Sequence, residues 1–162
     1  TQTLHKLLLE FGTPAGVLAA SPRALAVVVP PRLASSITAG GASDEALSAV
    51  AAWLDDPANH IITLADSEYP QSLLQTADPP PLLYAKGRIG LLNQPAFAIV
   101  GSRNATAQGS ANAEAFATTL GDAGMVIVSG LALGIDAAAH RGGLASRAST
   151  IAVVGTGLDS VY

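Results

Sequence analysis

The chain has 162 residues and contains no cysteine, which excludes disulfides and cysteine-based zinc sites and is typical of a protein from a reducing compartment. Aromatic residues make up only 4% of the sequence, so the core must be built from Ala, Val, Leu and Ile. No apolar run reaches the ~18 residues of a membrane helix, and the N-terminus lacks the layout of a signal peptide. These features predict a cytoplasmic protein without a membrane segment.

Charge is scarce and unevenly placed. The net charge is −4, which argues against a broad surface for polyanions. Residues 1–85 carry three basic and eight acidic residues, whereas residues 86–162 carry five basic and four acidic ones. Any contact with nucleic acid is therefore expected in the second half.

Residues 1–58 read as a small helical domain. Leu4, Leu7, Leu8 and Phe11 form a helical stripe that Gly12 can end. Ser or Thr followed by Pro then recurs as a helix start, at Thr13 and at Ser21, and a further helix is expected from Ser43 or Asp44 with an apolar face of Leu47, Val50, Ala51 and Leu54. The turns between helices permit a helix-hairpin-helix DNA module, but the acidic composition favours a packing or interaction domain.

Residues 59–94 are expected to form an extended connector packed on the next domain. A short strand is predicted at 61–64, and three consecutive prolines from Pro79 enforce an extended backbone. Lys86 and Arg88 end this segment and could reach a ligand, although solvated surface charges are the plainer interpretation.

From residue 95 to 162 the pattern alternates between strand and helix, which predicts an α/β fold with the first half of a doubly wound parallel sheet. The apolar runs "AFAIVGS", "MVIVSG" and "STIAVVG" each end in glycine, and Phe97 and Phe116 are expected to be buried. Ligands of such sheets bind at the carboxyl ends of the strands, where Gly101, Gly130 and Gly155 fall.

Two glycine loops at neighbouring strand ends favour a phosphate-binding site. Gly101, Ser102 and Arg103 offer a close backbone approach, a hydroxyl and a guanidinium fork. The second loop, with Ser129, Gly130, Leu131 and Gly134, leads into a helix whose N-terminus favours an anion.

Several common chemistries have no motif here. The dinucleotide fingerprint and its acidic ribose ligand are missing, as is any Gly-Lys-Ser/Thr sequence, so neither NAD nor P-loop chemistry is expected. Asp136 and His140 stand four residues apart on one helix face and could form an acid/base pair. A helix cap at Asp136, hydrogen-bonded to His140, explains them equally well, and neither a catalytic residue, a metal nor a cofactor is predicted.

Four ordered segments resemble the bacterial DNA-processing protein A family, also called Smf. They are "ITLADSEYPQSLLQTADPPPLLYAKG", "AIVGSRNATAQG", "VIVSGLALGIDAAAH" and "TIAVVGTGLDSVY". The resemblance implies an extended Rossmann fold after a sterile-alpha-motif-like domain. It also implies a non-enzymatic protein that binds single-stranded DNA, protects it during natural transformation and presents it to the RecA recombinase.

The resemblance also implies roles for single residues. Arg103 would contact the DNA backbone, and Asp136 and His140 would hold the loop. The family continues where this sequence stops, so the chain is expected to be a fragment of a protein that is homodimeric at full length.

Two alternatives remain open. One is a nucleoside-monophosphate phosphoribohydrolase of the lysine-decarboxylase-like (LOG) family, which shares the fold and a Gly-Ser loop. The other is an interaction domain that binds no nucleic acid.

Overall fold

A computed structural model describes residues 2–40 and 42–158. The chain divides into two compact units, Thr1–Gly87 and Arg88–Tyr162, and each is described by itself. The finer division predicted from the sequence, into 1–58, 59–94 and 95–162, stays a prediction.

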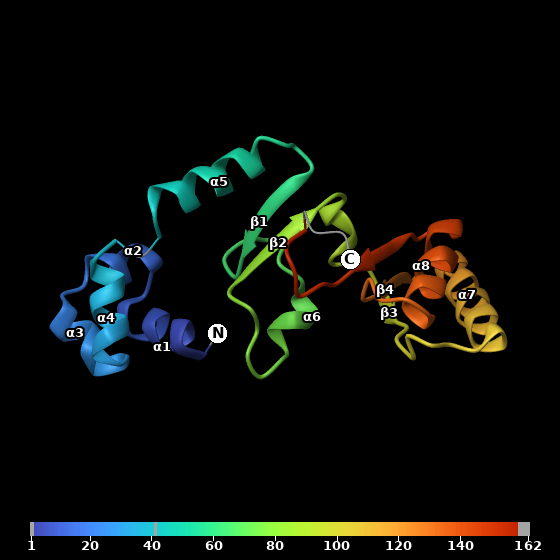
Figure 1. Ribbon diagram of the computed structural model, residues 1–162, viewed down its shortest axis with the longest axis horizontal. Helices are drawn as coiled ribbons and strands as arrows, with labels where there is room; N and C mark the ends of the chain where they lie inside the picture. The colour runs from blue at the N-terminus through green and yellow to red at the C-terminus, as the bar shows by residue number, and fades with distance from the viewer. Residues whose placement is uncertain (1, 41, 159–162) are drawn as a thin grey trace. The chain divides into compact units, whose positions relative to one another are not determined.

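The first unit begins with four short helices (Figure 1), which agrees with the predicted helical region, although no separate helix was predicted over 31–38. They are α1 (Gln2–Phe11), α2 (Pro14–Ala19), α3 (Pro22–Val28) and α4 (Pro31–Thr38). Hydroxyl caps start two of them, because Thr13 Oγ1 accepts from the N–H of Gly16 at 3.0 Å and Ser21 Oγ from that of Ala24 at 3.2 Å. These predicted caps, and the end of α1 at Gly12 with φ +76°, are confirmed.

The helices enclose a small aliphatic core. Its buried members are Leu7, Val17, Leu25, Val29 and Ala34. The core contains no aromatic side chain that is fully buried, as the composition predicted, although Phe11 packs against its rim.

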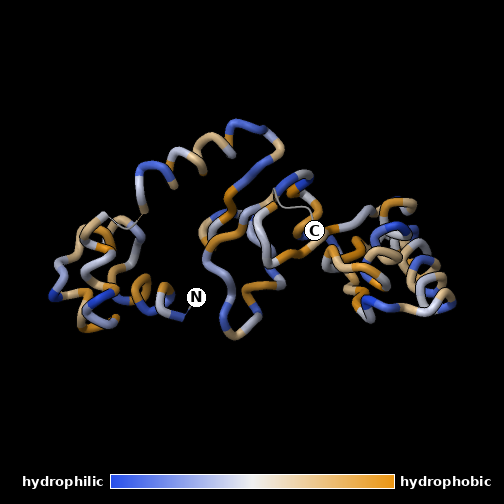
Figure 2. The backbone as a smooth tube through the Cα atoms, in the orientation of Figure 1, coloured by the Kyte–Doolittle hydropathy of each residue, from blue (hydrophilic) through white to orange (hydrophobic). Residues whose placement is uncertain are grey.

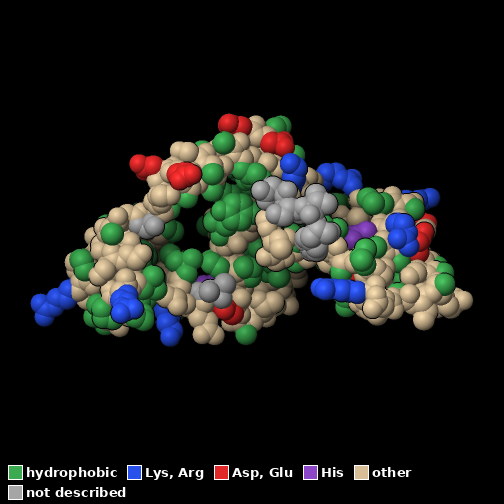
Figure 3. Space-filling model, in the orientation of Figure 1, with side chains coloured by type: hydrophobic (Ala, Val, Ile, Leu, Met, Phe, Trp, Pro, Cys, Tyr) green, Lys and Arg blue, Asp and Glu red, His purple; other side chains and the backbone are tan. Residues whose placement is uncertain are grey.

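Helix α5 (Asp44–Leu54) follows, with its predicted cap at Ser43. Its apolar face is exposed, since Leu47 and Leu54 keep 57% and 41% of their accessible surface and no residue of the helix is buried. Acidic side chains gather over this helix in Figure 3. The sequence pattern identified the shared face correctly, but it could not say whether that face is covered.

The rest of the first unit is built on an antiparallel pair, β1 (Asn59–Thr63) and β2 (Leu82–Lys86), with the short α6 (Gln71–Leu74) between them. The strand predicted at 61–64 is thus confirmed with a small shift. Tyr69 is fully buried, and its hydroxyl donates to the Pro80 carbonyl at 2.6 Å, so burial raises the pKa of this phenol. Asp66 closes the turn after β1.

Asp66 Oδ2 accepts hydrogen bonds from both the N–H and the hydroxyl of Thr63, at 2.7 and 2.8 Å. These bonds lower the pKa of Asp66, because they favour the charged carboxylate.

The second unit is a parallel α/β sheet. Its elements are η1 (Ile89–Leu91), β3 (Ala96–Ala98), α7 (Ala107–Asp122), β4 (Val126–Ser129), α8 (Ile135–Ala145) and β5 (Thr150–Ala152). The strands are ordered β3-β4-β5 and both pairs are parallel. The predicted α/β class, helices followed by a parallel sheet, is therefore confirmed.

Helices α7 and α8 lie side by side on one face of this sheet (Figure 1). Ala117, Ile127 and Ala139 are fully buried between the helices and β4. A Cβ at Gly142 would collide with the carbonyl of Glu114 on α7, so glycine at this position permits the close approach of the two helices. Figure 2 shows apolar residues distributed in short stretches over the chain.

The predicted burial of both phenylalanines is wrong. Phe97 on β3 keeps 48% of its accessible surface and Phe116 on α7 keeps 65%. Phe97 lies on the edge strand, and Phe116 lies on the exposed surface of α7. Val100 and Val153, which follow the ends of β3 and β5, are also exposed, at 70% and 63%.

No helix in residues 2–40 and 42–158 is long and apolar enough to cross a membrane.

Candidate functional site

Three loops meet at the carboxyl ends of β3, β4 and β5, where the sequence placed the site. Gly101–Thr106 follows β3, Ser129–Gly134 begins at the last residue of β4, and 153–157 follows β5. The last four residues of the third motif, 159–162, lie outside the described residues. Parallel strands bring these loops to one edge because all their carboxyl ends point the same way.

The first two loops are interlocked. The N–H of Ile135 donates to the Ser102 carbonyl at 3.1 Å, and the Ile135 side chain fills the space beside Gly101, where a Cβ would lie 2.8 Å from Ile135 Cγ1. Gly134 has φ +80°, and a Cβ there would meet the Ser102 carbonyl and lie 2.6 Å from the Arg103 carbonyl. The second loop therefore fixes the backbone that carries Arg103.

Arg103 is exposed at the tip of the first loop. In the described part of the chain no carboxylate lies within ion-pair distance of it. The loop itself is ordered locally, because Ser102 Oγ accepts from the N–H of Asn104 at 3.1 Å and Thr106 caps α7 through the N–H of Gly109 at 3.0 Å. A rigid backbone thus presents an available guanidinium, which suits a phosphate oxygen.

The second loop rests on buried polar groups. Ser129, 2% exposed, donates its hydroxyl to the Ile99 carbonyl at 2.6 Å and ties the ends of β3 and β4 together. Beyond it, the N–H of Val153 donates to the Ser129 carbonyl at 2.9 Å. Ser129 is accordingly placed to support the loop, while Gly130, partly buried, follows at its surface.

His140 reaches the same loop from α8. Its Nε2 lies 2.8 Å from the Gly130 carbonyl, and because a carbonyl can only accept, Nε2 carries the hydrogen. Its Nδ1 lies 2.8 Å from Thr150 Oγ1, and as the unprotonated nitrogen it accepts from this hydroxyl, whose oxygen also lies 2.7 Å from the Ile127 carbonyl. Both ring nitrogens are thus engaged within the protein, and neither is available for a ligand in this arrangement.

Asp136 lies in the first turn of α8 and is 8% exposed. The helix cap predicted at this residue is wrong, because the N-cap is Gly134, and so is its hydrogen bond to His140. Its Oδ2 lies beneath Gly130, 2.8 Å from where a Cβ of that residue would be. A carboxylate in the first turn is stabilised by the helix dipole.

Sequence reasoning missed two supporting residues. Ile135 locks the first loop and Thr150 holds His140, yet both belong to ordinary apolar or strand patterns that carry no functional signal. Leu131 and its neighbour Leu133 are 53% and 77% exposed on the second loop, which adds apolar surface beside Arg103's loop.

The two accessory basic residues lie elsewhere. Lys86 is on β2 in the first unit and pairs with Asp56 at 3.1 Å, an interaction that helps to lower the pKa of that carboxyl after the stronger effect of the Ala58 N–H. Arg88 lies near the amino-terminal edge of the parallel sheet and not at the loops. Within residues 2–40 and 42–158 no cluster of three His, Asp or Glu residues could hold a metal ion.

Comparisons with known proteins find a matching family and several similar proteins. The profile of the family described as DNA recombination-mediator protein A matches residues 60–162. Protein Smf of Escherichia coli is 41% identical over 111 residues, which are 68% of this chain and 29% of the relative. DNA processing protein DprA of Streptococcus pneumoniae is 46% identical over 100 residues, 62% of this chain and 35% of the relative. The chain thus spans about a third of the length of these relatives.

Two solved structures are similar. The X-ray structure of DNA processing protein A from Streptococcus pneumoniae matches with a TM-score of 0.78 and 33% identity, over 99% of this chain and 55% of that chain. DNA processing protein A from Helicobacter pylori, whose structure describes a single-stranded DNA binding mode, matches with a TM-score of 0.55 and 35% identity, over 64% of this chain and 46% of that one.

Proposed function

Because this chain belongs to the family of DNA recombination-mediator protein A, we propose that it binds single-stranded DNA at the strand-end loops of its second unit. Arg103 would pair with a backbone phosphate, and the loop Ser129–Gly134 would line the same site with Gly130, Leu131 and Gly134. The related protein from Helicobacter pylori, which binds single-stranded DNA, supports this proposal.

One observation carries the proposal most directly. An exposed arginine without an ion-pair partner among the described residues lies on a loop that is held by its neighbour through Ile135 and Gly134. Such preorganisation lowers the entropic cost of binding a flexible strand. Backbone contacts of this kind give binding that is independent of sequence and sensitive to salt.

The role we propose is binding and not catalysis. His140, the best candidate for a general base, has both ring nitrogens bonded to Gly130 and Thr150, and Asp136 is buried beneath the loop. These two residues would hold the loop in place. No observation in the structure favours the alternative nucleotide hydrolase.

We further propose a cytoplasmic role in natural transformation, in which a homodimer protects incoming single strands and presents them to the RecA recombinase. This step is tested by measuring whether the chain accelerates RecA filament assembly on single-stranded DNA. A rate that does not change on addition of the chain would contradict RecA presentation by this portion.

DNA binding itself is tested by fluorescence anisotropy with labelled dT20 at two salt concentrations. We expect the wild-type chain to bind more weakly at the higher salt concentration. At either concentration, Arg103→Ala should reduce the binding free energy by about 1.5–3 kcal/mol, because one charged contact is lost. Arg141→Ala is the matched control, because Arg141 also lies in the second unit but pairs with Glu114 at 2.9 Å. Equal affinities of the two variants would refute the assignment of Arg103.

A further inference from the structure

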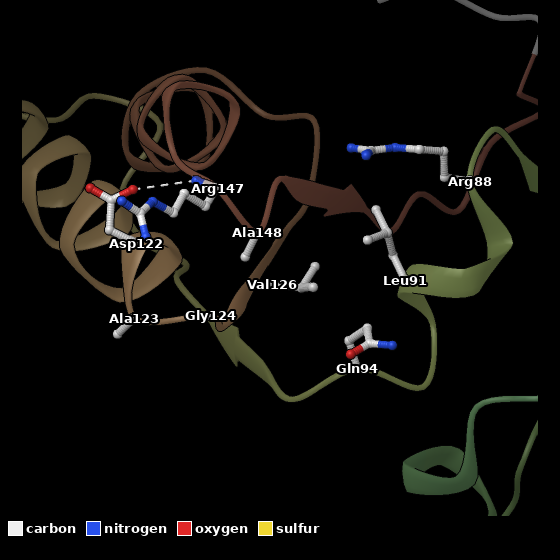
Figure 4. A pocket seen from close by; sticks show the side chains of 9 residues that line it. All are labelled: Arg88, Leu91, Gln94, Asp122, Ala123, Gly124, Val126, Arg147 and Ala148. Atoms are coloured by element: carbon white, nitrogen blue, oxygen red, sulfur yellow. Dashed lines mark hydrogen bonds between the residues drawn. The ribbon is translucent and has the colours of Figure 1, made fainter.

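A second basic feature lies at the opposite edge of the parallel sheet. A groove of about 360 Å³ opens where α7 ends and where β4 and β5 begin (Figure 4). Arg88 and Arg147 line it from two different segments, and Leu91 and Ala148 provide apolar surface between them, above the buried Val126. Strand residues advance about 3.3 Å each, so the three steps of β4 place this groove about 10 Å from the loop site.

The rim that carries Arg147 is fixed by the end of α7. The N–H of Arg147 donates to Asp122 Oδ1 at 3.3 Å, and the N–H of Ala148 donates to the Gly121 carbonyl at 3.2 Å. Ser149, the next residue, has φ +73°, the one positive φ of a non-glycine residue in the described part of the chain. A non-glycine residue in this conformation costs free energy, and such strain is often found at functional sites.

The charges in the groove favour an anion. The second unit contains four arginines and no lysine. Arg141 pairs with Glu114, whereas within residues 88–158 neither Arg88 nor Arg147 has a carboxylate at ion-pair distance. Asp122 also lines the groove and accepts a backbone hydrogen bond at the rim, so the groove carries two positive side chains and one negative one.

We propose that this groove is a second contact for the backbone of single-stranded DNA, in which Arg88 and Arg147 bind phosphate oxygens and the apolar floor contacts sugar or base. Guanidinium groups bind phosphate with a planar fork, which makes phosphodiester the best match to a pair of unpaired arginines. This inference rests on the proposed DNA binding and adds a location that the glycine loops do not include. A strand of a few nucleotides fills the loop site alone, whereas a longer strand reaches both edges of the sheet.

The test compares the 162-residue chain with two double variants, using labelled dT6 and dT25 in fluorescence anisotropy over a salt series. Arg88→Ala/Arg147→Ala removes the groove cations, and Arg23→Ala/Arg32→Ala removes the same charge from the first unit. Each contact to a single-stranded phosphate contributes about 0.7 to the slope of log affinity against log salt, so two lost contacts lower that slope by about 1.4. We expect this loss for dT25 with the groove variant only, and unchanged dT6 binding for both variants.

Each other outcome has a distinct meaning. Unchanged dT25 binding and slope in the groove variant overturn the inference and leave the loop site intact. If the wild-type chain does not bind DNA, the proposed function fails together with this inference. If the groove variant loses affinity for dT25 but Arg103→Ala does not, only the assignment of the loop site fails. If the groove variant lost binding to poly-glutamate but kept its binding to dT25, the groove would be a site for an acidic protein, which would overturn the inference.

Folding and charge are controlled separately. Both arginines are exposed, so the groove variant is expected to retain the wild-type circular dichroism spectrum and melting temperature. Arg88→Lys/Arg147→Lys keeps the charge and should recover most of the salt slope. Failure of this variant to recover the slope, in a folded protein, would show that the effect of the alanine variant is not electrostatic.

Discussion

The interlock between the two glycine loops can be tested at Gly134. Replacement by alanine adds one methyl group at a residue with φ +80°, and that Cβ would lie 2.6 Å from the Arg103 carbonyl, 0.8 Å inside the 3.4 Å of an ordinary contact. The second obstacle is the Ser102 carbonyl, which is even closer. Because both obstacles are backbone atoms, no side-chain rotation relieves them and the first loop must move.

Two terms set the expected loss of stability. The φ of +80° and ψ of −122° of Gly134 lie outside the left-handed helical region, so an alanine there costs about 1–3 kcal/mol, and overpacking against a fixed backbone adds about 1–3 kcal/mol. Gly124 provides the control in the same unit, since it has φ +94° but no atom within 4 Å of its Cβ position. Gly124→Ala should therefore lose only the first term.

Differential scanning calorimetry measures this difference. For a unit of this size, an additional 2 kcal/mol corresponds to a fall of about 8–16 °C in melting temperature. We expect Gly134→Ala to melt at least several degrees below Gly124→Ala. Equal melting temperatures would refute the interlock, because the clash would then have no energetic consequence.

The same substitution should weaken DNA binding at the loops. Displacement of the Ser102–Arg103 backbone moves the guanidinium away from its phosphate. Gly12→Ala is the control for binding, because Gly12 has φ +76° and open space around it but lies in the first unit. If a folded Gly134→Ala variant bound DNA with wild-type affinity, the contacts between the two loops would not be needed for the proposed DNA binding.

Two further predictions concern the first unit. Asp66→Asn should destabilise the chain at neutral pH. Hydrogen bonds from Thr63 lower the pKa of the folded Asp66 carboxylate below 3.8. The stabilisation by this carboxylate is therefore complete above that value and is lost as pH falls through the folded pKa. The difference between the melting curves of the two proteins should therefore begin to shrink as pH falls below about 4 and vanish below the folded pKa, and a constant difference at all pH values would contradict this. Tyr69→Phe should cost about 1 kcal/mol in urea unfolding, since the Pro80 carbonyl loses a 2.6 Å hydrogen bond, and an unchanged midpoint would show that this bond contributes nothing.

Features of the fold that depend on neighbouring residues in the chain, such as helix caps and strand ends, were predicted well from the sequence. The hydroxyl caps at Thr13, Ser21 and Ser43 and the glycine-terminated parallel strands depend on neighbours in the chain, and the structure confirms them. Burial was predicted poorly, because periodicity shows which residues share a face and not whether another element covers it. Phe97 illustrates the difference, since it belongs to the predicted strand but lies on the edge strand β3, whose three residues are all exposed.

The same reasoning applies to the candidate site. Both loops could be predicted, because glycine at the end of a strand is visible in the sequence. The residues that hold those loops could not be predicted, since Ile135 acts through a backbone N–H and Thr150 through a hydroxyl that β-strands commonly carry. The cap predicted at Asp136 was wrong, because a carboxylate near a helix start is typical of a cap, whereas the N-cap of α8 is Gly134.

Trp53 is the only tryptophan of the chain, and its ring meets that of Tyr84 edge-on with the centroids 5.5 Å apart. Both residues belong to the first unit, whereas the proposed DNA contacts belong to the second. Intrinsic tryptophan emission is therefore a built-in reporter for the unit that does not contact the ligand. A shift of that emission when dT25 is added would reveal communication between the two units without any attached dye.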